Sequence, residues 1–220
     1  MIQGYTYGKS LDDASSLGEQ VNPLNHRLLY GPSSFDLRQN FVISYRWELP
    51  INRLLHVENR LTQDWAISGI TRFGTGFPVT LYNDSDRSLL GTQPDGINNY
   101  GVDEPEFTPG PLDLNHNPRD GKPYFNTSLF NLQPLGTPGN ADRRFFYGPG
   151  INNFDVALLK DLHLTESKQL QFRFEAFNVF NHAQFFGPTS VNGNISSSVF
   201  GDVVSAAAPR LVQLGAKFDF

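Results

Sequence analysis

The sequence predicts an all-β fold, an antiparallel up-and-down meander of about six strands. Helical spacing is scarce, whereas alternation of apolar and polar residues recurs along the chain. Phe is unusually abundant, with 19 residues, and aromatic side chains favour strands. The segments between the alternating stretches are by turns long and short. Together these observations indicate strands that run back and forth between two unlike ends.

Each predicted strand shows one apolar and one polar side, as a half-buried strand does. In "QFRFEA" (171–176), Phe172 and Phe174 share one side. Arg173 and Glu175 share the other. In chain order the six segments are "GYTYGKS" (4–10), "NFVISYRWELP" (40–50), "DWAISGITRFGTGFP" (64–78), "NNFDVALLKDLHL" (152–164), "QLQFRFEAFNVFNH" (169–182) and "LVQLGAKFDF" (211–220).

The predicted connections alternate in length. Residues 11–38, 78–149 and 182–209 form long connections, whereas 50–62 is shorter and "TESKQ" (165–169) is a tight turn. Loops longer than ~15 residues are uncommon in ordinary domains. Long loops on one side and short turns on the other are typical of outer-membrane barrels, where the loops are extracellular and the turns periplasmic. The six strands are therefore interpreted as an incomplete portion of a large transmembrane β-barrel. The alternative is a soluble or cell-surface β-sandwich that binds carbohydrate.

Composition narrows the function classes. The formal charge of -5 and pI near 5.5 argue against a nucleic-acid binder, which is usually basic. Without Cys there is no disulfide framework, thiolate metal site or Cys nucleophile. No run of 18 apolar residues indicates a transmembrane helix, and mean hydropathy is -0.36, which is compatible with strands that hide their apolar half in alternation. The first residues, "MIQGYTYGKS", show no basic n-region, apolar core or cleavage site, so no signal peptide is expected in them.

Six ordered blocks also resemble a known family. They are "YTYGKSLDDAS" (5–15), "FDLRQNFVISYRWELP" (35–50), "WAISGITRFGTGFPVT" (65–80), "YFNTSLFNLQPLGTPGNADRRFFYGPGINNFDVALLKDLHLTE" (124–166), "LQFRFEAFNVFNHAQFFGP" (170–188) and "VFGDVVSAAAPRLVQLGAKFDF" (199–220). In this order they are similar to the C-terminal barrel region of Oar-like TonB-dependent outer-membrane transporters, which often carry a carboxypeptidase-regulatory-like domain before the plug. The resemblance covers nearly the whole chain.

The resemblance implies a receptor in the cell outer membrane that takes up an unknown substrate with energy relayed by TonB. Such transporters close with about 22 strands around a plug. We therefore expect residues 1–220 to be the C-terminal part of the barrel, without plug or signal peptide, so that TonB acts only through N-terminal regions missing here. The resemblance also implies that the terminal strand is the signal for the barrel-assembly machinery, through Val212, Leu214, Ala216, Phe218 and Phe220.

The alternation predicts which side chains meet lipid and which meet the lumen. The predicted lumen-facing residues are Arg46, Glu48, Asp155, Arg173, Glu175 and Lys217. Aromatic girdles are predicted at both membrane interfaces. Trp47, Trp65 and Phe220 fall at the periplasmic end; the other end has Phe73, Phe77, Phe177 and Phe180. The apolar register changes between Ala176 and Phe177, which predicts a β-bulge or a strand exit there.

The sequence predicts no enzyme, cofactor or metal site. The five His residues (26, 56, 116, 163 and 182) show no metal-ligand spacing. "DLNHNPRDGKPY" (113–124) has oxygen ligands at alternate positions, but Pro118 stands where a calcium loop needs Gly and Tyr124 where it needs Glu. A turn-rich loop is the simpler interpretation. For the sandwich alternative, a sugar-binding platform would comprise Phe145, Phe146, Tyr147, Phe185 and Phe186.

Overall fold

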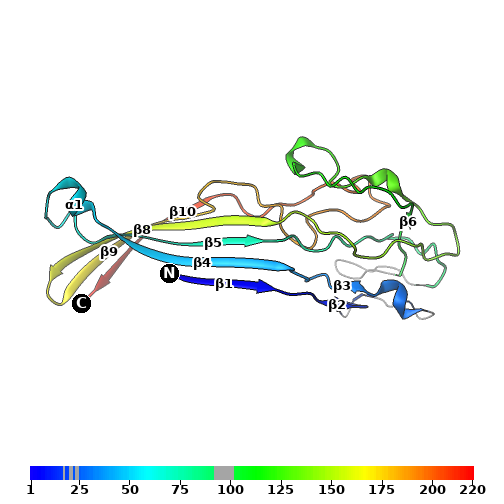
Figure 1. Cartoon of the computed structure of the whole chain (residues 1–220), viewed down its shortest axis with the longest axis horizontal. Helices are drawn as coiled ribbons and strands as arrows, with labels where there is room; N and C mark the ends of the chain where they lie inside the picture. The colour runs from blue at the N-terminus through cyan, green and yellow to red at the C-terminus, as the bar shows by residue number, and fades with distance from the viewer. Residues whose placement is uncertain (17, 20–21, 23–24, 92–101) are drawn as a thin grey trace.

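The computed structural model describes residues 1–16, 18–19, 22, 25–91 and 102–220. Its main element is a six-stranded sheet in the order β1-β4-β5-β8-β9-β10 (Figure 1). The strands are β1 (Ile2–Tyr7), β4 (Gln39–Leu49), β5 (Trp65–Gly74), β8 (Ile151–Thr165), β9 (Lys168–Phe177) and β10 (Leu211–Asp219). Every neighbouring pair is antiparallel, so the predicted all-β meander is confirmed.

The sheet is open. β1 and β10 are its two edge strands, and they do not pair with each other in the described part of the chain. The described residues also contain two small sheets, β2-β3 and β6-β7, but no second large sheet that faces the first. The β-sandwich alternative is therefore wrong, because a sandwich needs two facing layers. The arrangement matches an incomplete barrel.

The two ends of the sheet carry unlike connections, as predicted (Figure 1). At one end, helix α1 (Ile51–Leu55) lies between β4 and β5, and residues 166–167 join β8 to β9. At the other end, the described parts of the connections 8–38, 75–150 and 178–210 gather beyond the strands (Figure 1). The elements of these described parts are short: β2 (Leu11–Asp12), η1 (His26–Leu29), β3 (Gly31–Pro32), β6 (Glu106–Phe107), η2 (Pro118–Asp120), η3 (Thr127–Leu129) and β7 (Phe130–Asn131). None of the helices among the described residues is long and apolar enough to cross a membrane.

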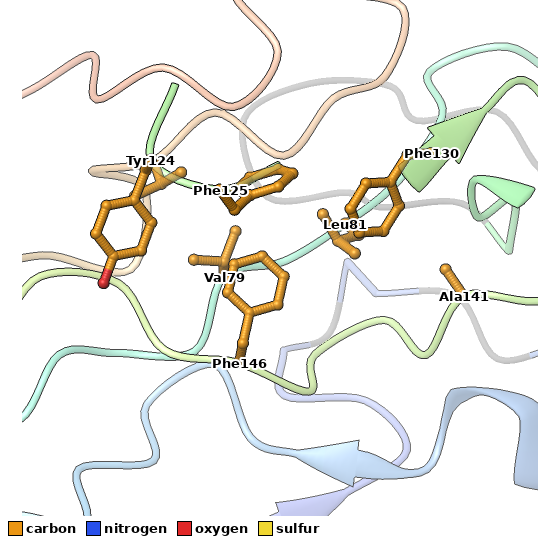
Figure 2. Packing of buried hydrophobic residues seen from close by; sticks show 8 residues of the cluster. Val79, Leu81, Tyr124, Phe125, Phe130, Ala141 and Phe146 are labelled. Atoms are coloured by element: carbon orange, nitrogen blue, oxygen red, sulfur yellow. The ribbon is translucent and has the colours of Figure 1, made fainter. Parts of the chain in front are cut away.

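The hydrophobic core lies in the long loops rather than on the sheet. Its buried side chains, most of which Figure 2 labels, are Val79, Leu81, Tyr124, Phe125, Phe130, Ala141, Phe146 and Val191. Phe125 lies at its centre, with ring centroids 5.4 Å from Phe130, 5.0 Å from Phe146 and 5.3 Å from Phe200, all edge-to-face. This geometry is favourable for aromatic pairs. The long connections therefore form a packed unit, called the loop core here.

The register change at the end of β9 is a strand exit. β9 pairs regularly with β10 up to Phe177, which lies opposite Leu211. The next residue, Asn178, has a left-handed φ of 50° and leaves the sheet. Its backbone N–H donates to the Oδ1 atom of Asp155 at 2.8 Å. Of the two predicted explanations, the exit is the one found; the shift in the β8-β9 pairing lies elsewhere, between His163 and Thr165.

Candidate functional site

Most of the charged residues of the strands lie on one face of the sheet; Lys160 of β8 is an exception, because it pairs with Trp65 and Phe172 on the other face. Directly paired residues share a face, and the row Arg46, Ser68, Ala157, Glu175 crosses four strands. Residues two or four positions away along a strand lie on the same face. The register therefore places all six predicted lumen-facing residues on this polar face: Arg46, Glu48, Asp155, Arg173, Glu175 and Lys217. That the polar face lines a lumen stays a prediction.

The charges on the polar face are partly paired. The guanidinium of Arg173 lies 3.0 Å from the Glu175 carboxylate along β9. Arg46 lies 3.9 Å from Asp161, and Lys217 lies 2.9 Å from Asp219. All three pairs are partly exposed, so each contributes at most about 1 kcal/mol to stability. These pairs make the polar face hydrophilic, but they add little to the stability of the sheet.

The opposite face is apolar. It carries the alternate positions of each strand, which include Ile43, Phe172, Phe174, Leu214 and Phe218. Several are large and exposed: Phe174 is 47% exposed and Leu214 is 76% exposed. A monomer in water rarely leaves so many neighbouring apolar side chains uncovered. An exposed apolar face opposite a charged one is the pattern of a transmembrane barrel wall.

The aromatic residues predicted for the periplasmic end, Trp47, Trp65 and Phe220, all lie toward the α1 end of the sheet. Trp47 pairs with Ile67, and Trp65 pairs with Leu49, so both indoles lie on the apolar face at the same end of the sheet. The indole Nε1 of Trp65 donates to the carbonyl of Leu61 at 2.8 Å. The rings of Phe218 and Phe220 stack with centroids 5.9 Å apart at the end of the last strand. This arrangement suits an interface, where the ring is apolar and its polar edge is satisfied.

At the long-loop end, the predicted girdle needs correction. Phe73 lies 5.5 Å from Phe154, which lies 5.1 Å from Phe180, so these three rings form one chain on the apolar side. Phe154 was not among the predicted girdle residues. Phe177 shares the polar face with Arg173 and Glu175, because β9 keeps its register to its last residue.

Phe77 also differs from its prediction. It lies beyond β5 and packs against Phe186, with ring centroids 4.8 Å apart. The guanidinium of Arg72, a polar-face residue, lies 5.2 Å from the centroid of the same Phe186 ring. Phe77 therefore belongs to the loops above the polar face and not to an outward girdle.

Predicted assembly-signal residues of the last strand occupy the free edge of the sheet. Val212, Leu214, Ala216 and Phe218 lie opposite Ala176, Phe174, Phe172 and Leu170 of β9, on the apolar face. Phe220 follows the strand and is 92% exposed. The other side of β10 has no partner strand among the described residues. Its recognition by the assembly machinery stays a prediction.

A buried polar cluster ties the first long loop to the second. Arg144 donates to Ser15 Oγ at 3.0 Å and to Thr80 Oγ1 at 2.8 Å, and forms an ion pair with Glu19. Arg143 donates from Nε to Glu104 Oε1 at 3.0 Å. All four ionisable side chains, Glu19, Glu104, Arg143 and Arg144, are nearly inaccessible to solvent. Buried charges persist only when paired, so this cluster requires residues 19, 104, 143 and 144 to be assembled together.

Within that cluster, Glu104 is the residue whose ionised form is destabilised most by burial. The ion pair with Arg143 lowers its pKa, but burial raises it more, to about 8. In addition, Glu104 Oε2 has no hydrogen-bond partner among the described residues. The neighbouring Asp103 accepts from Ser88 and Gln133, and burial raises its pKa as well.

A further hydrogen-bond chain ties the second long loop to the third. Gln133 bridges Asp103 and Asn83, and Asn83 Oδ1 accepts from Ser196 Oγ at 2.7 Å. Asn83 and Gln133 are fully buried. All three long loops are thus joined by polar contacts as well as by the loop core. Nothing in the sequence indicated these pairings, because the partners are far apart in the chain.

A cavity of about 560 Å³ lies where the loops meet the ends of β5 and β8. Its lining includes His116 and Arg119 around η2, Tyr124 from the loop core, and His182 and Phe185 from the third loop. The Tyr124 hydroxyl donates to the carbonyl of Tyr147 at 3.0 Å, and burial raises the pKa of Tyr124 to about 12. It therefore stays protonated. This cavity was not predicted from the sequence.

The other sites considered from the sequence do not assemble. In the 113–124 loop, the Asp120 carboxylate accepts from the Lys122 N–H and the Asn115 amide, which lower its pKa, so the loop is a hydrogen-bonded turn. Among the described residues, no group of three or more His, Asp or Glu side chains is placed to hold a metal ion. The predicted aromatic platform is also wrong, because Phe146 is buried in the loop core.

Comparison with known proteins agrees with a sheet that has one polar and one apolar face. Residues 2–213 match the sequence model of the outer membrane beta barrel domain. The chain belongs to this family. Membership places the protein in the outer membrane and identifies its sheet as part of a barrel. No curated protein and no solved structure gives a match.

For a member of the outer membrane beta barrel family, the two faces have a direct physical meaning. The hydrocarbon of the membrane accepts apolar side chains, and the inside of a large barrel is polar. Phe172 and Phe174 suit the first environment, while Arg173 and Glu175 suit the second. The sequence signal for this site was the period-two alternation. The signal for the loop core was only the density of Phe in loops.

Proposed function

We propose that this chain forms the C-terminal strands of a TonB-dependent receptor of the Oar-like type, which takes up a substrate across the outer membrane. The observation that carries the proposal is the open sheet itself. One face is charged, the other is apolar, and β1 and β10 both leave an edge without a partner strand in the described chain. An open edge is not tolerated in lipid, because each unpaired backbone group there costs several kcal/mol.

The remaining strands of the barrel must therefore come from elsewhere. Six strands are too few to enclose the charged side chains of the polar face with water, since even about eight leave room only for packed side chains. A receptor barrel of about 22 strands leaves room for a plug. The resemblance of the six ordered blocks to Oar-like receptors supports this larger assembly. In it, TonB acts on regions that precede these strands.

The same geometry supports the partners that we propose. The apolar face contacts outer-membrane lipid, and the last strand, ending at Phe220, contacts the barrel-assembly machinery during insertion. The transported substrate is bound by the loops. We propose a transport role and not catalysis, because the charged pairs on the polar face lie in open, partly exposed positions.

Growth tests of mutant cells can examine the proposal. Cells that lack the gene for this chain, and cells that lack TonB, are grown on a panel of scarce nutrients. The gene deletion should reproduce a subset of the growth defects caused by loss of TonB. Removing the gene in cells that already lack TonB should add no further defect. A growth defect that is additive with loss of TonB would refute TonB-dependent uptake.

A matched pair of variants separates assembly from transport. A chain that lacks residues 211–220 should fail to restore growth and should be absent from the outer membrane. Lys217→Gln, which removes an exposed charge of that strand and its solvent-exposed pair with Asp219, should restore both. Rescue by the truncated chain would contradict the role of the last strand.

A further inference from the structure

The cavity of about 560 Å³ at the loop end of the sheet has an unusual charge pattern. The chain as a whole carries a formal charge of -5. Nevertheless, among the described residues no Asp or Glu lines this cavity, whereas Arg119, His116 and His182 do. The nearby Asp120 keeps its negative charge but does not line the cavity, and its carboxylate accepts from the Asn115 amide and the Lys122 N–H. The local electrostatics therefore favour an anion.

Arg119 is available to bind such an anion. It lies in η2 and is exposed, and its guanidinium forms no hydrogen bond or ion pair with the part of the chain that the structure describes. By contrast, Arg143 and Arg144 are committed to carboxylates in the buried cluster. A guanidinium presents donors in a planar fork that matches carboxylate and phosphate oxygens.

His182 is held in place by a neighbouring amide. Gln184 accepts from the Asn152 N–H at 3.1 Å and donates to the Asn152 carbonyl at 2.7 Å, which sets the orientation of its amide group. Its Nε2 then faces His182 Nδ1 at 3.2 Å as a donor. Nδ1 must accept, so a neutral His182 carries its proton on Nε2. The imidazole therefore offers a fixed donor beside the cavity.

The rest of the lining suits a hydroxylated ring. The Asn117 side chain makes no capping hydrogen bond at the start of η2, so its amide is available to ligand hydroxyls. Phe185 supplies an aromatic surface on the side of the third loop. Small-ligand sites are typically about 300–1,000 Å³, with a few polar groups that fix orientation. The cavity lies within that range.

We propose that this cavity binds a sugar that carries an anionic group, with Arg119 and His182 on the anion and Asn117 and Phe185 on the ring. The shared chemistry is a carboxylate or phosphate attached to a hydroxylated ring. This inference rests on the proposed uptake function, because it assigns the substrate class of that receptor. It is independent of how the receptor is energised.

Direct binding measurements test it. The full-length protein that contains this chain, purified from outer membranes in detergent, is titrated calorimetrically at low salt with glucuronate, glucose 1-phosphate and glucose. At least one of the two anionic sugars should bind about tenfold more tightly than glucose, which corresponds to loss of one charge-assisted contact. The preference should fall as salt is added, since exposed charges are screened. Glucose binding as tightly as both anionic sugars, or failure of both anionic sugars to bind, would overturn the proposal.

Variants locate the site. Arg119→Gln should weaken binding of the anionic sugar roughly tenfold or more and leave glucose unchanged. Lys122→Gln is the matched control, because Lys122 is exposed in the same loop and does not line the cavity. Unchanged heat-dependent gel mobility verifies that each variant is folded. Equal losses in the two variants would argue against this cavity. Binding that depends on Arg119 without any TonB-dependent growth defect would leave the site standing and reject the uptake function.

Discussion

Tyr45 lies across Gly69 on the neighbouring strand. The two residues are direct partners in the β4-β5 pairing, and a Cβ atom added at Gly69 would lie 2.6 Å from the Tyr45 hydroxyl oxygen. It would also lie 2.5 Å from the backbone carbonyl oxygen of Asp155. The glycine thus allows an aromatic ring to cover the sheet and β8 to approach closely, as aromatic side chains often do over strand glycines.

We expect Gly69→Ala to destabilise the assembled barrel by about 1–3 kcal/mol, because the backbone of β8 must move to admit the methyl group. Denaturant unfolding of the barrel in detergent measures the change. Gly4→Ala is the control: it lies in the same sheet, and nothing lies within 4 Å of the added Cβ. Equal effects of the two substitutions would contradict the close approach.

Neighbouring residues of β9 should respond oppositely to a change in polarity. Phe174→Arg puts a charge on the apolar face and should cost ~2–4 kcal/mol near the membrane midplane. Arg173→Phe should be far milder, because it loses only a partly exposed pair with Glu175. The same unfolding experiment compares them. Similar costs would show that the two faces do not meet different solvents.

The long loops should face the outside of the cell. Lys122→Cys, in the second long loop, should react with a membrane-impermeant thiol reagent on intact cells. Lys122 is exposed and suits this substitution, whereas the neighbouring Gly121 has a φ of 74°, which favours glycine. Ser167→Cys, in the β8-β9 turn, should react only after the outer membrane is opened. Reaction of Ser167→Cys and protection of Lys122→Cys would invert the topology.

Rising pH should loosen the loops. The pKa of Glu104 is raised by burial from 4.5 to about 8 in the folded chain. Between these values the folded state holds a proton on Glu104 that the unfolded state has released. The contribution of this proton to folding stability is therefore complete below pH 4.5 and is lost as the pH rises to about 8. Limited proteolysis, corrected with an unstructured substrate, should cut the loops faster at about pH 8.5 than at about pH 5. Glu104→Gln should shrink that difference; an unchanged difference would exclude Glu104 as its source.

The 220-residue chain alone should not behave as a soluble monomer. Its apolar face is exposed, and its two edge strands offer unpaired backbone groups to other chains. We expect aggregation, or a need for detergent or partner strands. Size-exclusion chromatography without detergent is the measurement. A monodisperse monomer with a cooperative thermal transition would count against a barrel wall.

The strands could be predicted from the sequence because their signal is local. The alternation of Phe172, Arg173, Phe174 and Glu175 identifies both the strand and its two faces, and no distant residue alters it. The open meander and the alternation of long and short connections were predicted on the same basis and are confirmed. The ends of the strands are harder to predict from the sequence, as Phe177 illustrates. It continues the apolar spacing of the following loop while its backbone remains in β9.

The loops could not be predicted, because their contacts are not local. Phe146 and Tyr147 look alike as candidates for an aromatic surface. Yet Phe146 is buried against Phe125, whereas Tyr147 donates to Asp36 at 2.6 Å, and Asp36 lies in another loop. The cavity depends likewise on bringing Arg119 near His182. Single-residue patterns carry no information about such pairings.

The buried polar contacts between the long loops imply an order of events during folding. The β8-β9 hairpin joins residues that are close in sequence, whereas the contacts of Arg144 with Glu19 and of Ser196 with Asn83 span 125 and 113 residues. Contacts between residues so far apart in the sequence form slowly, because large chain loops must close first. The β8-β9 hairpin can therefore form before the whole chain has reached the membrane. The contacts between the long loops form last, because they require residue 196 to be in place.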